Sequence, residues 1–220
     1  MIEEPPVIRS VVFDVGETLL DDTREFQAWA DWLSVPRHTL SALVGIVVAQ
    51  GRNNAEAFQY LRPGIDLTAE RERREAAGLG EQIGEADLYA DVRPAMTELR
   101  RRGVWVGVAG NQTVRAAHLL RTLALPVDAI ATSGEWQVAK PDPLFFARVV
   151  EFAPGEPSEI LYVGDHRDYD VTAAHAAGLR PALIKRGPWG HLWADDPAIA
   201  DTGAWVLESL EELADLVRPS

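Results

Sequence analysis

Three aspartates are the residues of this sequence best suited to chemistry. Asp14 ends the apolar run 11–13, Asp165 follows the apolar run 160–163 after one glycine, and Asp170 comes five residues later. A carboxylate that ends a buried strand is costly unless it is paired, and two of them on neighbouring strands repel each other. A divalent cation would remove that repulsion, and oxygen ligands favour Mg²⁺. The alternative is that each aspartate only caps the helix that follows it.

Lys140 is the cation expected to accompany these carboxylates. It is one of two lysines in the chain, and it stands in the segment Ala-Lys-Pro-Asp-Pro. The two prolines predict a loop directly before a helix. A lysine in such a loop is commonly solvated, but the loop would also allow Lys140 to reach an anion held at the aspartates.

Short apolar segments alternate with helical ones over most of the chain. Helices of 10–15 residues between the later strands indicate right-handed crossovers and an α/β fold with a parallel, doubly wound, Rossmann-like sheet. Ligands of such sheets lie beyond the carboxyl ends of the strands, where Asp14, Gly110, Asn111 and Asp165 fall. The predicted strands are residues 9–15, 104–109, 129–132, 160–163, 182–185 and 205–207.

About 70 residues of helical character separate the first strand from the second, which is too long for one crossover. We therefore expect a helical subdomain at residues 21–90, inserted into a core domain formed by residues 1–20 and 91–220. Within the insertion, Thr68 is expected to cap a helix that runs to residue 77. Helical spacing predicts that its aromatic residues form its own core rather than a substrate pocket: Phe26, Trp29, Trp32 and Phe58.

The composition excludes several classes of protein. The chain has 220 residues, 47% of them hydrophobic, which is enough for a folded core. The absence of cysteine excludes disulfides, thiol catalysis and thiolate zinc sites. A net charge of −13 argues against a nucleic-acid partner. No apolar run approaches the ~18–20 residues of a membrane span, so we expect a cytoplasmic protein without a membrane partner. The oligomeric state is not predicted.

Four segments together resemble the four motifs of the haloacid dehalogenase (HAD) superfamily. They are residues 12–19 (VFDVGETL), 106–111 (VGVAGN), 140–143 (KPDP) and 163–165 (VGD) with Asp170. Their order and spacing agree with the family, and the helical insertion stands where the family carries its type-one cap. The resemblance covers nearly the whole chain.

The resemblance implies a phosphatase-type hydrolase that acts on a small phosphorylated metabolite with Mg²⁺ as cofactor. Asp14 would be the nucleophile that forms an aspartyl-phosphate, and Lys140 the second catalytic residue. Positioning and charge stabilisation supply most of the catalysis in such reactions. The implied metal ligands are Asp14, the main-chain carbonyl of Gly16, Asp165 and Asp170. The implied phosphate-binding residues are Gly110, Asn111 and Lys140.

Two positions depart from the phosphatases of this family. These enzymes carry a second aspartate two residues after the nucleophile, which protonates the leaving group, and here that residue is Gly16. Their second motif ends in serine or threonine, and here that residue is Gly110. Loss of a general acid lowers rates by ~10²–10⁴. Glu17 is a possible substitute for the acid, unless it points to solvent, and Thr113 for the hydroxyl.

A different class of function stays open at this point, a phospho-ligand binding or scaffold protein that keeps the metal site without turnover. Two other branches of the family are disfavoured. Phosphonate-cleaving relatives need a cap lysine, which residues 21–90 lack, and dehalogenases place an aromatic hydroxyl where Gly16 stands. His166 is expected to be either a solvated histidine or a residue that supports a metal ligand, rather than a catalytic residue. Residues 187–193 are expected to form an aromatic loop that serves mainly packing.

Overall fold

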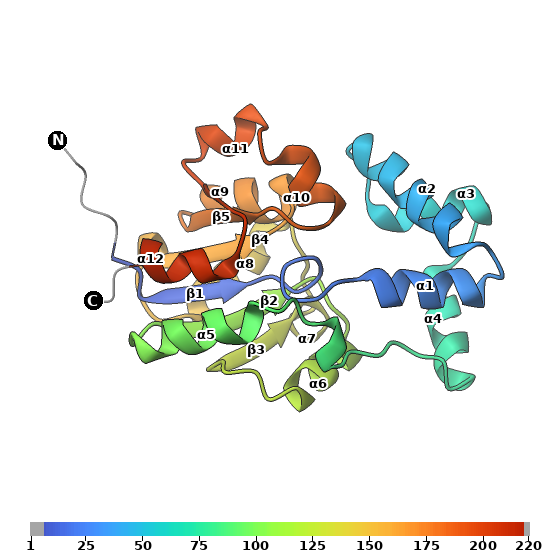
Figure 1. Ribbon diagram of the computed structural model, residues 1–220, viewed down its shortest axis with the longest axis horizontal. Helices are drawn as coiled ribbons and strands as arrows, with labels where there is room; N and C mark the ends of the chain where they lie inside the picture. The colour runs from blue at the N-terminus through green and yellow to red at the C-terminus, as the bar shows by residue number, and fades with distance from the viewer. Residues whose placement is uncertain (1–6, 218–220) are drawn as a thin grey trace. The chain divides into compact units, whose positions relative to one another are not determined.

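A six-stranded parallel sheet is the framework of the protein, which a computed structural model describes over residues 7–217 (Figure 1). The strand order is β3-β2-β1-β4-β5-β6. Strands β2 and β3 are therefore added on one side of β1 and strands β4 to β6 on the other, which places the switch point of the sheet between β1 and β4. The predicted doubly wound α/β fold is therefore confirmed. The strands are β1 Ser10–Phe13, β2 Trp105–Gly110, β3 Ala129–Thr132, β4 Ile160–Gly164, β5 Arg180–Ile184 and β6 Trp205–Leu207.

The two central strands are continuous apolar runs because helices cover both faces of the sheet (Figure 1). Every residue of β1 and β4 is buried. Phe13 at the end of β1 stands opposite Val108 of β2 and Val163 of β4. This register brings the carboxyl ends of the three strands to one edge of the sheet.

Helices α5 and α12 pack against each other, as do α8 and α9. The α8–α9 layer meets the sheet in a buried cluster that includes Val12, Phe146 and Tyr162. The Tyr162 hydroxyl donates to the Ala109 carbonyl at 2.7 Å, so the buried phenol keeps a partner. The α-helices that accompany the sheet are α5 Val92–Arg101, α6 Val114–Thr122, α7 Ser133–Trp136, α8 Pro143–Phe152, α9 Ala173–Ala176, α10 Gly187–Trp193, α11 Pro197–Asp201 and α12 Leu213–Leu216.

Residues 22–83 form a compact helical unit of their own, and residues 84–90 belong by their contacts to the unit that holds the sheet. Trp29 packs edge to face on Phe58, with ring centroids 5.1 Å apart, and both side chains are buried. The Arg74 guanidinium covers the Trp29 ring at 4.3 Å. These two aromatic residues form core, as predicted. The helices of this unit are α1 Thr23–Trp32, α2 Arg37–Ala49, α3 Ala57–Leu61 and α4 Leu67–Ala76.

Two local predictions, the cap of α4 and the loop at 187–193, are wrong, and one predicted helix differs in type. Asp66, not Thr68, caps α4, because its carboxylate accepts the amides of residues 68 and 69. The helix expected at 169–177 begins as a π-helical segment, Arg167–Thr172, and continues as α9. Residues 187–193 form α10 rather than a loop. The proline in its first turn, Pro188, was the available signal for a helix.

No helix within residues 7–217 is by itself long and apolar enough to cross a membrane. Helices α1 and α2 meet the length and hydropathy requirement only as a pair, and the chain bends by 117° between them.

Candidate active site

The carboxyl ends of β1 and β4 bring two of the predicted aspartates next to each other. The two strands are adjacent, and the Asp14 amide continues their pairing by donating to the Val163 carbonyl at 2.8 Å. Asp14 follows β1 directly, and Asp165 follows β4 directly. The adjacency that the sequence predicted for these two residues is confirmed.

Asp14, Asp165 and Asp170 form a buried acidic cluster, in which one carboxylate oxygen from each residue lies within 4.8 Å of the others. Their exposed fractions are 8%, 5% and 1%. The His166 amide donates to Asp170 Oδ2 at 2.9 Å and so fixes the orientation of that carboxylate. Oxygen donors from several carboxylates at one buried point fit Mg²⁺ better than a softer metal. The residues present therefore fit the implied cofactor.

Lys140 lies inside this cluster rather than in solvent, since it is 6% exposed. Its ammonium donates to Asp14 Oδ1 and to Asp170 Oδ1, both at 2.6 Å. The rings of Tyr162 and Phe145 lie 5.5 and 5.9 Å from Lys140 Nζ. The alternative of a solvated loop lysine is thereby wrong.

The side chain of Asn111 holds the lysine loop in place. Asn111 Nδ2 donates to the Lys140 carbonyl at 2.9 Å, and the Lys140 amide donates to Asn111 Oδ1 at 2.8 Å. This pair of bonds connects the end of β2 to the segment between α7 and α8. Asn111 thus has a positioning contact that its motif alone does not reveal.

Two glycines leave room for the aspartates. A Cβ atom on Gly110 would lie 2.4 Å from Asp14 Oδ1, and one on Gly164 would lie 2.2 Å from Asp170 Cγ. Cβ atoms essentially never approach another heavy atom closer than 3.0 Å. In this arrangement the serine or threonine of the related phosphatases has no space at position 110.

Burial and mutual repulsion shape the electrostatics of the cluster. Burial raises the pKa of Asp14 to about 6, against the opposing effect of the Lys140 charge. Burial, with the charges of Asp170 and Asp14, raises the pKa of Asp165 well above its usual value. Burial would lower the pKa of Lys140, but the charges of Asp14 and Asp170 outweigh it and raise that pKa. The site therefore holds more negative charge than Lys140 can neutralise.

His166 is enclosed by aromatic rings beside this site. Its ring stacks on Tyr169 at 4.2 Å between centroids and lies 4.3 Å from Trp189 and 5.0 Å from Trp193. Burial lowers the pKa of His166 to about 4. Its Nδ1 accepts the amides of Asp168 and Tyr169, so the ring caps the π-helical segment. Of the two roles expected for His166, the solvated one is wrong, whereas its amide supports Asp170 as the other role requires. The predicted packing role of Trp189 and Trp193 is confirmed, because both side chains are buried.

Glu17 does not point freely into solvent. The Tyr89 hydroxyl donates to Glu17 Oε2 at 2.6 Å, and the Arg186 guanidinium lies over the Tyr89 ring at 4.2 Å. Sequence reasoning missed Tyr89 and Arg186 because no motif spacing links either residue to position 17. The one available signal was the place of Arg186 directly after a predicted strand end.

Gly16 and Thr113, the other two positions singled out in the sequence, lie in loops that follow strands. Gly16 forms an isolated bridge with Leu20 inside the loop after β1. The Thr113 hydroxyl accepts the Ala116 amide at 2.9 Å and caps α6. The hydroxyl of Thr113 is thus engaged in helix capping.

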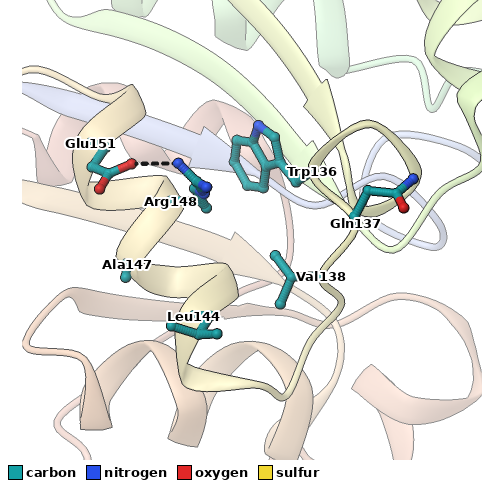
Figure 2. A pocket seen from close by; sticks show the side chains of 7 residues that line it. All are labelled: Trp136, Gln137, Val138, Leu144, Ala147, Arg148 and Glu151. Atoms are coloured by element: carbon teal, nitrogen blue, oxygen red, sulfur yellow. Dashed lines mark hydrogen bonds and ion pairs between the residues drawn. The ribbon is translucent and has the colours of Figure 1, made fainter.

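A cavity of about 340 Å³ lies between α7, α8 and the segment that joins them (Figure 2). It is lined from α7, from the segment that leads to Lys140 and from α8, and an Arg148–Glu151 ion pair of 3.0 Å closes one side. Neither the three aspartates nor Lys140 lines it. This cavity is therefore separate from the acidic cluster.

The chain is similar in sequence to known hydrolases. The family model "haloacid dehalogenase-like hydrolase" matches residues 8–178. The chain is 38% identical over 105 residues to "Phosphatase MT3486" of Mycobacterium tuberculosis, a match that covers 46% of this chain and 48% of that protein. It is 30% identical to "Phosphoglycolate phosphatase 1" of Pseudomonas aeruginosa over 93% of this chain and 78% of that protein.

Solved structures show the same fold. The HAD-hydrolase YfnB of Bacillus subtilis, whose crystal structure is described as bound to magnesium, superposes with a TM-score of 0.69 at 19% identity, covering 96% of this chain and 99% of that one. A TM-score of this size at so low an identity supports a shared fold and no more than that. With the family match and a helical insertion between β1 and β2, the chain belongs to the haloacid dehalogenase-like hydrolases, as a phosphatase-type member similar to subfamily IA.

Proposed function

We propose that this protein is a Mg²⁺-dependent phosphatase that hydrolyses a small phosphorylated metabolite through an aspartyl-phosphate on Asp14. The observation that carries the proposal is the bond from the buried Lys140 ammonium to Asp14, within the cluster that also holds Asp165 and Asp170. Relatives named as phosphatases of glyceraldehyde 3-phosphate, phosphoserine and phosphoglycolate support the substrate class.

The chain's own residues would divide the work as follows. An Asp14 carboxylate oxygen attacks phosphorus, and the bond between phosphorus and the ester oxygen breaks. Lys140 keeps Asp14 ionised and oriented, and its positive charge faces the phosphate oxygens. Water then attacks the aspartyl-phosphate, which releases inorganic phosphate and restores the carboxylate.

Asp14, the Gly16 carbonyl, Asp165 and Asp170 would hold the metal ion. When bound, the ion supplies positive charge that offsets the charge on the transferring phosphoryl group. Gly110 and Asn111 would contribute main-chain amides to phosphate binding.

Protonation of the leaving group is the weak point of this site, because Gly16 supplies no acid where the related phosphatases carry an aspartate. We infer that esters with good leaving groups, such as aryl phosphates, react faster than alkyl phosphates. Glu17 is the nearest carboxylate in sequence, and its bond to Tyr89 supports a positioned rather than a solvated side chain.

We also propose that the helical unit of residues 22–83, the larger part of the expected insertion 21–90, acts as a cap that excludes water from the site. Water exclusion strengthens the electrostatic interactions within a site and prevents side reactions. The insertion's own aromatic core supports a unit that moves as one body.

The second candidate function is a phospho-ligand binding protein without turnover, which the glycines at positions 16 and 110 favour. Steady-state hydrolysis of a panel of aryl and alkyl phosphates with Mg²⁺ separates the two functions. Multiple turnovers that disappear in Asp14→Asn support the phosphatase. Binding of phosphate esters without turnover, even of p-nitrophenyl phosphate, supports the binding protein.

A further inference from the structure

The loop after the nucleophile contains a residue in an unfavourable backbone conformation. Glu17 has φ +50°, in the left-handed region that side chains other than glycine rarely occupy. The loop is a tight turn, in which the amides of Leu19 and Leu20 donate to the Val15 carbonyl at 2.8 and 3.0 Å. The Glu17 amide donates to the Leu20 carbonyl at 2.8 Å. Contacts around the loop must therefore hold Glu17 in this conformation.

Tyr89 and Gly187 both lie against the Glu17 side chain. Tyr89 donates its hydroxyl to Glu17 Oε2 at 2.6 Å, a short bond to a charged acceptor. On another side Gly187 approaches so closely that a Cβ there would lie 2.6 Å from Glu17 Cβ. The side chain of Glu17 is thus confined between the segment before α5 and the start of α10.

The Arg186 side chain contacts both Tyr89 and the main chain of the loop that contains Glu17. It is 8% exposed, its guanidinium covers the Tyr89 ring at 4.2 Å, and its Nη1 donates to the Thr18 carbonyl at 2.6 Å. Its Nη2 donates to the Asp91 carboxylate, which also accepts the Ser209 hydroxyl at 2.8 Å. Arg186 therefore holds the Tyr89 ring against the loop and the loop against the end of β5.

We propose that Tyr89 and Arg186 are positioning residues that hold Glu17 in its left-handed conformation and thereby fix the plane of the Gly16–Glu17 peptide beside the acidic cluster. This inference rests on the proposed metal-dependent function, because the carbonyl of that peptide is the main-chain oxygen proposed as a metal ligand. The Tyr89 amide also donates to the Leu19 carbonyl at 3.0 Å, so side chain and main chain of Tyr89 act on the same loop.

The physical reason is the freedom of the glycine. Gly16 has no side chain to restrict its own dihedral angles, so the orientation of its carbonyl depends on the φ angle of Glu17 and on the bonds that maintain it. Without the Tyr89 hydroxyl, the left-handed conformation of Glu17 loses a side-chain bond. The shared peptide plane, which the bond from the Glu17 amide to the Leu20 carbonyl also orients, is then held less firmly. A rotation of this peptide therefore changes the metal site itself.

Calorimetric titration with MgCl₂ tests the proposal on wild-type protein, Tyr89→Phe, Glu17→Gln and Glu17→Ala. We expect Tyr89→Phe and Glu17→Ala to weaken Mg²⁺ binding about tenfold. Glu17→Gln keeps an acceptor for the Tyr89 hydroxyl and is expected to bind Mg²⁺ within about twofold of wild type. Tyr60→Phe is the matched control, because it removes a hydroxyl that pairs with Arg52 in the helical unit and should leave Mg²⁺ binding unchanged.

Hydrogen exchange of the metal-free protein tests the Tyr89–Glu17 contact independently of metal binding. Tyr89→Phe should speed exchange of the amides at 17, 19 and 20 at least about fivefold, with the β1 amides unchanged. Unchanged exchange in that loop overturns the proposal whatever the metal does. If exchange speeds up but wild type binds no Mg²⁺, the positioning role stands and the proposed metal-dependent function fails. Equal losses of Mg²⁺ binding in Glu17→Gln and Glu17→Ala would mean that the charge of Glu17 acts directly, which also overturns the proposal.

Discussion

Replacement of Gly110 by alanine is the sharpest test of the site's geometry. A Cβ at position 110 would lie 2.4 Å from Asp14 Oδ1, whereas Cβ atoms keep at least 3.0 Å, so this carboxylate oxygen must move by 0.6 Å or more. The same oxygen accepts the Lys140 ammonium at 2.6 Å, and that bond lengthens or breaks as the oxygen moves. Positioning errors of about 1 Å cost up to ~10² in rate. We therefore expect kcat/KM to fall at least about tenfold.

The cost in stability should be moderate, because the atom that must move is the end of a side chain. Overpacking of this kind costs ~1–3 kcal/mol, which lowers the melting temperature of a domain this size by roughly 2–12 °C. Hydrolysis of p-nitrophenyl phosphate with saturating Mg²⁺ and a thermal melt measure both effects.

The matched control is Gly45→Ala, at a position in α2 where a Cβ meets nothing within 4 Å. It should keep full activity and gain ~0.5–1 kcal/mol from helix propensity. The reasoning is refuted if Gly110→Ala retains wild-type kcat/KM, or if Gly110→Ser, which introduces the hydroxyl of related phosphatases, raises activity. Either result would mean that Asp14 works from a position other than the one it holds beside Lys140.

Three further predictions concern the metal and the missing acid. Mg²⁺ at about 100 times its Kd should stabilise the protein by ~2.7 kcal/mol. Asp165→Asn should remove most of the resulting shift in melting temperature. The control Asp168→Asn alters an ion pair with Arg167 and should keep that shift. The pKa of Asp14 is raised to about 6, so its proton stabilises the metal-free fold below pH 4 and that stabilisation is lost as pH rises through 6. Because Mg²⁺ must displace this proton, the Mg²⁺-induced shift should grow between pH 5 and 7, and a shift that shrinks over this range would contradict the argument. Gly16→Asp should raise turnover of an alkyl phosphate at least about tenfold, a small part of the ~10²–10⁴ of acid–base catalysis, and fast wild-type turnover of alkyl phosphates would contradict it.

The sheet and its charged edge could be predicted from sequence because both depend on local patterns. The apolar run of Val11, Val12 and Phe13 is too short for a helix and indicates a strand. A carboxylate at the carboxyl end of a parallel strand lies where such sheets bind their ligands. The same argument applies to Asp165. Once the two strands are predicted to be neighbours, it also predicts that Asp14 and Asp165 lie next to each other. The proline pattern around Lys140 predicted its loop but not its burial, which depends on Asp14 and Asp170 meeting it in space.

The contacts that the sequence did not reveal join segments far apart in the chain. Tyr89 and Glu17 are 72 residues apart and Arg186 and Thr18 are 168 apart, and no periodicity or motif links such pairs. Thr68 appeared to be a helix cap because threonine is a common one, yet Asp66, two residues earlier, has the stronger acceptor. The same reasoning failed at residues 187–193, where glycine and proline suggested a loop although Pro188 suits the first turn of a helix.

The charges of the site explain why a cation and a phosphate ester should bind there together. Asp14, Asp165 and Asp170 bring three carboxylates to one buried point, and Lys140 supplies one positive charge. If all four groups are ionised, the site carries a net charge of −2, which repels a phosphate ester. Burial makes the charged forms costlier still and raises the pKa values of Asp14 and Asp165. One Mg²⁺ brings this net charge to zero and provides a positive surface for the ester, while Lys140 keeps Asp14 oriented. The acidic cluster is thus unfavourable by itself and becomes favourable when a divalent cation binds, as a metal-dependent phosphatase requires.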